Sequence, residues 1–161
     1  KLSDNRIAVA GSRSGQPGVP GAVSYSRDFW VYLLDGDGNL LFVRQYRHAA
    51  GMDMLELPAG TRDGDEPFEE CAAREIREET GMEAGKLIHI GSFYLAPGYS
   101  TEYMGVFLAT DLKHNPLEAD EDEFLSVEKI PVKDALKMAE KGEMPDAKSL
   151  AALLMARAYL E

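Results

Sequence analysis

The stretch GTRDGDEPFEECAAREIREETGM, residues 60–82, decides the fold of this 161-residue chain. Its segment 67–80 begins with a proline, which suits the first turn of a helix, and stops before Gly81, which suits a helix end. At about 100° per residue, the apolar members of this segment share one stripe: Phe68, Cys71, Ala72 and Ile76. We therefore expect a helix with one face buried in the core.

Three glutamates, Glu75, Glu78 and Glu79, lie on or beside this stripe in the last turns of the expected helix. Residues three and four apart are neighbours on a helix surface, so their carboxylates can converge. Like charges repel, and inward-facing carboxylates also lose hydration. Bound cations would remove both penalties, and hard divalent ions such as Mg²⁺ or Mn²⁺ prefer oxygen ligands. The pattern predicts a metal site; the alternative, a solvated acidic face, suits Glu69 and Glu70 better.

Two other side chains of the segment have simpler interpretations. Arg74 lies four residues from both Glu70 and Glu78, so we expect it to orient carboxylates or to form an ordinary surface ion pair. Cys71 lies on the apolar stripe, which favours a buried, inert thiol over a nucleophile.

Composition limits the function classes. The length suits one domain with a substantial core. The net charge of −11, without a visible basic patch, argues against a nucleic-acid partner. Anionic small molecules remain candidate substrates, because bound metal ions can invert the local field. The single cysteine permits no internal disulfide, which suits a reducing cytoplasm, and no apolar run reaches membrane-spanning length. We expect a cytoplasmic protein without a membrane partner.

Residues 1–24 are rich in Gly, Ser and Pro and predict a loop-like arm, followed by one domain over residues 25–161. Within this domain, the apolar patterns predict strands over 29–34, 40–46, 54–57, 86–95, 103–110 and 124–130. The first two strands flank an Asp-Gly-Asp-Gly turn and should form a hairpin. Helices are expected over 132–141 and 146–160, with Asp146 as the cap of the second. These elements suggest a mixed sheet between layers of helices.

Residues 60–82 also carry a motif of fixed spacing: Gly60, five residues, Glu66, seven residues, then Arg74-Glu75-Ile76, Glu78-Glu79 and Gly81-Met82. The motif resembles the Nudix box, Gly-x5-Glu-x7-Arg-Glu-U-x-Glu-Glu-x-Gly-U with U aliphatic, at every position. This resemblance implies the α/β Nudix fold, a mixed β-sheet sandwiched between helices (α/β/α). It also implies metal-dependent hydrolysis of a nucleotide diphosphate linkage, with Mg²⁺ as the cofactor and Mn²⁺ as a possible substitute.

Sequences outside the box are similar to the ADP-ribose pyrophosphatase branch: Glu56-Leu-Pro-Ala-Gly, Val43-Arg-Gln-Tyr-Arg, and Pro97, sixteen residues after Gly81. Related nucleotide-sugar hydrolases share much of this pattern. The branch usually has a longer, strand-rich N-terminal extension that is often exchanged between subunits, whereas loop-like residues precede the first strand here. The resemblance implies a homodimer that takes a small-molecule nucleotide substrate.

Carried over residue by residue, the resemblance assigns metal binding to Glu75 and Glu79, with Glu78 close by. It adds the backbone carbonyl of Ala59 as a further oxygen ligand, and a loop carbonyl beside two carboxylates suits Mg²⁺.

Five further residues would form the substrate site. By the resemblance, Arg47 would contact the phosphates, and Glu56 would help to hold the ligand. Glu102 would lie near the metals or the terminal ribose, and Pro97 and Gly98 would shape the loop wall. The alternatives are an exposed strand-end charge for Arg47, a strand-end cap for Glu56, and an ordinary turn at Pro97 and Gly98.

The catalytic base of this branch is a glutamate on a loop between the box helix and the C-terminal helices. An ungapped alignment of residues 130–149 brings Glu121 into that position, and Glu123 is the next choice. We expect one of them to take a proton from a metal-polarised water, while Arg47 stabilises charge on the phosphates. Most other carboxylates of the acidic segment 118–123 are interpreted as solvated charge.

Three functions are weighed. The first is cleavage of ADP-ribose or a related nucleoside diphosphate sugar to a nucleoside monophosphate and a sugar phosphate. The second is another Nudix activity, such as clearance of damaged nucleoside triphosphates, against which Pro97 argues. The third is a non-catalytic nucleotide-binding domain, which loss of box carboxylates would favour, although all are present.

Overall fold

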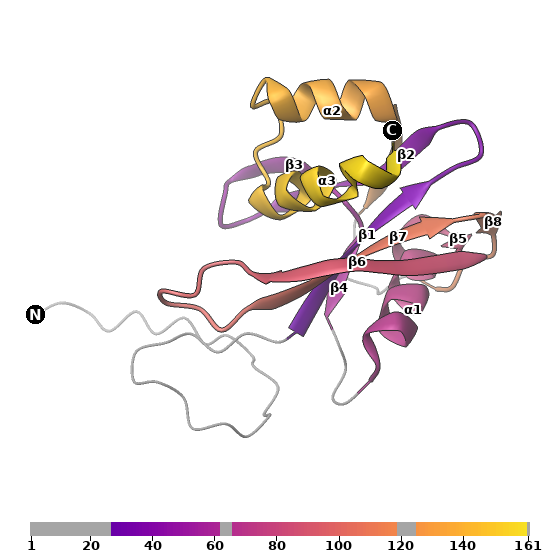
Figure 1. Ribbon diagram of the computed structural model, residues 1–161, viewed down its shortest axis with the longest axis horizontal. Helices are drawn as coiled ribbons and strands as arrows, with labels where there is room; N and C mark the ends of the chain where they lie inside the picture. Colours follow the sequence, from indigo (N-terminus) through magenta and orange to yellow (C-terminus); the bar gives the residue numbers. More distant parts are fainter. Residues whose placement is uncertain (1–26, 62–65, 119–124, 161) are drawn as a thin grey trace, which may run out of the picture.

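The computed structural model describes residues 27–61, 66–118 and 125–160, with the backbone alone for 27–30 and 32 (Figure 1). The predicted arm over residues 1–24 and the two candidate bases, Glu121 and Glu123, lie outside this part of the chain. None of the helices in the described ranges is long and apolar enough to cross a membrane.

The described residues contain a seven-stranded mixed sheet. Strand β1 (Arg27–Leu34) runs parallel to β7 (Tyr103–Thr110), and every other strand pair is antiparallel. A parallel pair needs a long crossover connection, and the chain between β1 and β7 contains helix α1 (Phe68–Thr80). The main strand order is β3-β2-β1-β7-β6, with β4 on β1 and β9 on β2. The remaining strands of this sheet are β2 (Asn39–Arg47), β3 (Met52–Glu56), β4 (Ala59–Thr61), β6 (Lys86–Tyr94) and β9 (Ser126–Pro131).

Helices cover both faces of the sheet, as Figure 1 shows: α1 lies on one face, while α2 (Val132–Glu140) and α3 (Ala147–Leu160) lie on the other. Successive side chains of a strand point to opposite faces. On β7, Val106 and Leu108 therefore pack in the cluster under α2 and α3, whereas Phe107 packs in the cluster under α1. The predicted α/β/α sandwich is confirmed.

The predicted strands and helices are observed, with ends that shift by one or two residues. The first two strands form the predicted hairpin, in which Leu33 faces Leu41. Three short strands were not predicted: β4, β5 (Met82–Glu83) and β8 (Lys113–His114). Such short segments carry no readable alternation, because their pairing depends on distant partners. Of these three strands, β4 alone joins the main sheet: it pairs with β1 and lies beside α1.

Two helix ends near the sheet are fixed as the sequence predicts. Helix α1 ends at Gly81, whose left-handed backbone (φ 70°) lets its N–H donate to the Arg77 carbonyl. Helix α3 is capped by Asp146, because the Ser149 N–H donates to its Oδ2 at 2.8 Å. The stripe on α1 is buried as expected, with Cys71, Ala72 and Ile76 at most 1% exposed.

Candidate active site

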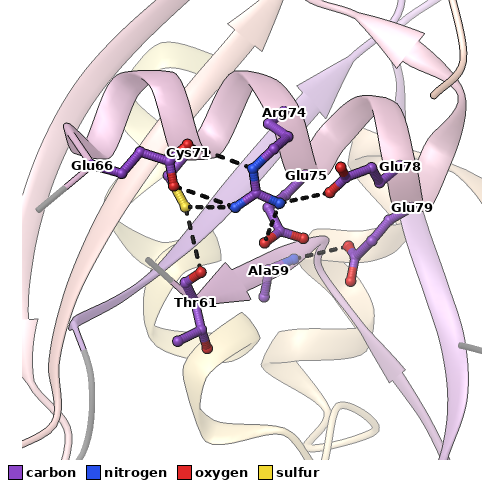
Figure 2. Close-up of polar contacts among 8 residues, drawn as sticks. All are labelled: Ala59, Thr61, Glu66, Cys71, Arg74, Glu75, Glu78 and Glu79. Atoms are coloured by element: carbon purple, nitrogen blue, oxygen red, sulfur yellow. Dashed lines mark hydrogen bonds and ion pairs between the residues drawn. The ribbon is translucent and has the colours of Figure 1, made fainter. Parts of the chain in front are cut away.

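The last turns of α1 lie against β4, and Glu79 is the side chain that joins them. Its carboxylate is only 8% exposed, and its Oε2 accepts a hydrogen bond from the Ala59 N–H at 3.0 Å. Figure 2 shows Glu75 and Glu79 on the side of α1 that faces this strand. Ala59 thus lies beside Glu79 and contacts this carboxylate through its amide nitrogen.

Glu75 lies over Gly60, the next residue of β4. A Cβ atom at residue 60 would lie 2.4 Å from both Cγ and Cδ of Glu75, which no real contact tolerates. The absence of a side chain at Gly60 therefore makes the space that Glu75 occupies.

Arg74 provides counter-charge to the glutamates of α1 (Figure 2). Its Nη1 lies 2.7 Å from Glu78 Oε2 and 3.0 Å from Glu75 Oε1, and its Nη2 lies 3.3 Å from Glu66 Oε2. Burial lowers the pKa of Arg74, but the hydrogen bond with Glu66 and the charges of Glu75 and Glu78 outweigh it and hold that pKa above its usual value. The expected partner Glu70 is exposed, and the described contacts place Glu66 there instead, which corrects that prediction.

The three glutamates have the right chemistry for a divalent ion, although they are not arranged as a closed cage. Among the described residues, no group of three His, Cys, Asp or Glu side chains stands ready to hold a metal. Glu75 and Glu79 nevertheless present carboxylate oxygens toward the same short strand, and hard divalent ions prefer such oxygens. Arg74 supplies charge balance to Glu75 and Glu78 that a cation would otherwise supply.

Arg47 is held by a buried carboxylate. Its Nε and Nη2 donate to the two oxygens of Glu56 at 2.7 and 2.6 Å, and the Glu56 side chain is 4% exposed whereas that of Arg47 is 44% exposed. The hydrogen bond with Glu56 raises the pKa of Arg47, and the charges of Asp146 and Glu79 act in the same direction. The guanidinium is therefore held by Glu56 and remains partly open to solvent.

The geometry agrees with the comparison to known proteins. The NUDIX domain model matches residues 24–153. The chain belongs to the Nudix family. It is 39% identical over 136 residues to the ADP-ribose pyrophosphatase of Bacillus subtilis (strain 168), covering 83% of this chain and 70% of that protein. It is also 33% identical over 121 residues to a GDP-mannose pyrophosphatase of Shigella flexneri serotype 5b, covering 70% of this chain and 63% of the relative.

A solved structure agrees with these sequence relatives. The fold matches a crystal structure of an ADP compounds hydrolase with a TM-score of 0.74 and 28% identity, over 84% of this chain and 74% of that one. The predictions of the ADP-ribose pyrophosphatase-like branch and of a Nudix diphosphatase enzyme are confirmed. Nudix hydrolases generally use divalent metal ions.

Another buried glutamate, the predicted substrate-site residue Glu102, is paired with a cation that the sequence did not reveal. Glu102 is 6% exposed, and its Oε1 lies 2.6 Å from Nζ of Lys148 on the first turn of α3. Lys148 gave no signal because a lysine in a helix is normally a surface residue. The only local clue is its place two residues after the cap Asp146.

Pro97 and Gly98 are both exposed in the connection between β6 and β7. The Tyr99 and Ser100 N–H groups donate to the Ala96 carbonyl around them, which forms a turn. A Cβ atom on Gly98 would meet nothing within 4 Å, so no neighbour requires a glycine there.

The thiol of Cys71 and the ring of His89 lie outside the acidic cluster. Cys71 is fully buried, and burial raises its pKa to about 12, so the prediction of an unreactive thiol is confirmed. His89 is exposed, its Nε2 lies 2.9 Å from Ser92 Oγ, and the centroid of its ring lies 5.0 Å from that of Phe107.

Removing the Arg47 guanidinium should weaken both the fold and substrate binding. Arg47→Ala leaves the Glu56 carboxylate buried without its bidentate partner. We expect the free energy of unfolding to fall by roughly 1–2 kcal/mol. This is less than the roughly 3–5 kcal/mol lost when one partner of a fully buried ion pair is removed, because the guanidinium is partly hydrated. Urea unfolding measures this loss.

Arg44→Ala is the matched control, because Arg44 lies on the same strand and pairs with Glu128 in an exposed ion pair. Arg44→Ala should lower the free energy of unfolding by less than about 1 kcal/mol and leave KM unchanged. The double variant Arg47→Ala/Glu56→Gln should be more stable than Arg47→Ala, but its KM should stay as high as that of Arg47→Ala. A normal KM for a diphosphate substrate in Arg47→Ala would exclude Arg47 from phosphate binding.

Proposed function

We propose that this chain hydrolyses the diphosphate linkage of ADP-ribose, or of a closely related nucleoside diphosphate sugar, with Mg²⁺, which Mn²⁺ can replace. From ADP-ribose the products are AMP and ribose 5-phosphate. The observation that carries the proposal is the buried Glu79 carboxylate, which accepts a hydrogen bond from the Ala59 N–H. The named activities of its relatives, an ADP-ribose pyrophosphatase and a GDP-mannose pyrophosphatase, support the substrate class.

In this proposal, Glu75 and Glu79 hold the metal, with Glu78 and the Ala59 carbonyl as further oxygen ligands. A bound divalent ion neutralises diphosphate charge and lowers the pKa of a water. Arg74 already balances the charges of Glu75 and Glu78 through ion pairs at 3.0 and 2.7 Å. The network also keeps their side chains oriented before a substrate binds.

Other side chains orient the substrate in the same proposal. Arg47, held in place by Glu56, binds the phosphates through its solvent-facing side and stabilises their developing charge. Glu102 faces the terminal ribose, and Pro97 and Gly98 line the loop beside it. Glu121 or Glu123 takes the proton from the attacking water.

A substrate panel tests this function. The purified chain is incubated with Mg²⁺ and, separately, ADP-ribose, GDP-mannose, other nucleotide sugars and nucleoside triphosphates, and phosphate-containing products are followed by chromatography. We expect the highest kcat/KM for ADP-ribose or another nucleoside diphosphate sugar. Preference for nucleoside triphosphates would select the second Nudix activity, and tight ADP-ribose binding without turnover would select the non-catalytic alternative.

The base assignment has its own test. We expect Glu121→Gln to lower kcat by roughly 10²- to 10⁴-fold, the range of general base catalysis, with little change in KM. Glu118→Gln, in the same acidic segment, is the matched control and should keep wild-type kinetics. If Glu123→Gln loses the activity and Glu121→Gln keeps it, the base is Glu123.

We also propose that the enzyme is a homodimer of the cytoplasm. The resemblance to the ADP-ribose pyrophosphatase branch supports the dimer, and a single buried cysteine, Cys71, suits a reducing compartment. Light scattering of the purified chain decides between a monomer and a dimer.

A further inference from the structure

One buried polar side chain, Ser149, has no place in the proposed chemistry, yet it contacts the backbone that leads to Glu79. Ser149 is 0% exposed on the first turn of α3. Its Oγ accepts a hydrogen bond from the Leu57 N–H at 2.9 Å and donates to Asp146 Oδ2 at 2.6 Å. A hydroxyl can do both at once, which neither an alanine methyl nor a carboxylate can do.

Leu57 begins a three-residue segment, Leu57–Pro58–Ala59, in which each residue is fixed by a different element. Ser149 of α3 holds the Leu57 N–H, and the Pro58 carbonyl accepts from the Val31 N–H of β1 at 2.9 Å. The Ala59 N–H donates to Glu79 of α1. Because the proline ring fixes φ at residue 58, a displacement of Leu57 is passed on to Ala59.

We propose that Ser149 is a positioning residue that sets the place of Ala59, and through it of the Glu79 carboxylate. Asp146 holds Ser149 in place, because its Oδ2 accepts hydrogen bonds from both the hydroxyl and the N–H of Ser149. The charge of Asp146 also acts on Arg47. The first turn of α3 therefore interacts both with the segment that carries Ala59 and with Arg47. The kinetic and Mn²⁺-affinity parts of this inference rest on the proposed function, whereas the position of Ala59 does not.

A purely structural role is the competing explanation. A buried N–H without a partner is costly, and Ser149 satisfies that of Leu57. On that account, loss of the hydroxyl lowers stability and does nothing else. The two roles therefore separate in measurements made on the folded protein.

The test compares three substitutions of this residue in the full chain. Ser149→Ala removes the hydroxyl, Ser149→Cys keeps the volume with a weak acceptor, and Ser149→Thr keeps the hydroxyl. For Ser149→Ala and Ser149→Cys, we expect kcat for ADP-ribose and the affinity for Mn²⁺ alone to fall roughly 10- to 100-fold, as for other groups that orient metal ligands. In both variants, the exchange of the Ala59 amide hydrogen should accelerate. Ser149→Thr should keep kcat, the affinity for Mn²⁺ and the Ala59 exchange rate close to wild type.

Asn39→Ala is the control for lost stability, because it removes side-chain hydrogen bonds to Asp35 in the β1–β2 turn. It should lower Tm without changing kcat, Mn²⁺ affinity or Ala59 exchange. If Ser149→Ala behaves like Asn39→Ala, the positioning role is wrong. If Ser149→Ala does not fold, Ser149→Cys decides the same comparison.

The amide-exchange and Mn²⁺ measurements do not depend on the substrate. If the wild-type chain hydrolyses nothing in the panel, the proposed function fails, and these two measurements still decide whether Ser149 positions Ala59.

Discussion

Glu79→Gln is expected to lower kcat by roughly a thousand-fold, about 4 kcal/mol in the activation barrier. The fold should survive, because glutamine keeps a side-chain oxygen that can accept the Ala59 N–H bond now made at 3.0 Å. What disappears is the negative charge, which in our proposal binds the metal. Steady-state kinetics at saturating Mg²⁺ and a thermal melt of the same preparation measure the two effects separately.

The control for this variant is Glu69→Gln, the same substitution on the exposed face of α1. It should leave both kcat and Tm close to wild type. Full activity in Glu79→Gln would contradict the metal assignment directly. A drop in Tm of similar size to that of a core variant would instead show that Glu79 is needed for folding.

The second large effect is expected from Gly60→Ala. The added Cβ would lie 2.4 Å from Cγ and Cδ of Glu75 and 2.6 Å from its Oε1, so the carboxylate has to move. A flexible side chain can yield at little cost in stability, and we therefore expect a change of less than about 1 kcal/mol in unfolding free energy. Displacing a proposed metal ligand should lower kcat roughly 10²-fold, the cost of misplacing a reacting group by about 1 Å.

Gly36→Ala is the matched control for Gly60→Ala. A Cβ atom at residue 36 meets nothing within 4 Å, and no left-handed backbone is recorded there. It should change neither kcat nor stability by a measurable amount. Equal activity in Gly60→Ala and wild type would mean that the position of Glu75 is unimportant for turnover.

Most of the fold could be predicted because its elements carry local signals. The α1 stripe and its terminal Gly81 mark a helix, and the continuous apolar run of β7 marks a strand with two buried faces. Strand β4 could not be predicted, because its three residues become a strand only by pairing with β1.

The placement of the acids on α1 and of Arg74 beside them could be predicted, whereas the partners that α3 supplies could not. Spacing on one helix brings Glu75, Glu78 and Glu79 together, and the sequence contains that spacing. Lys148 and Ser149 lie on α3, whereas their partners Glu102 and Leu57 lie far earlier in the chain, so only the tertiary fold brings each pair together. Within the box segment, Arg74 pairs with Glu66 in place of the expected Glu70.

The central claim is that carboxylates at the end of α1 bind a divalent ion beside β4. Its most direct test is an anomalous difference map from crystals grown with Mn²⁺ and a non-hydrolysable ADP-ribose analogue. The account predicts a manganese peak coordinated by Glu75 and Glu79, with the analogue's diphosphate against it. Density for the analogue without manganese at these carboxylates, and with Arg74 still paired to Glu75, would contradict it.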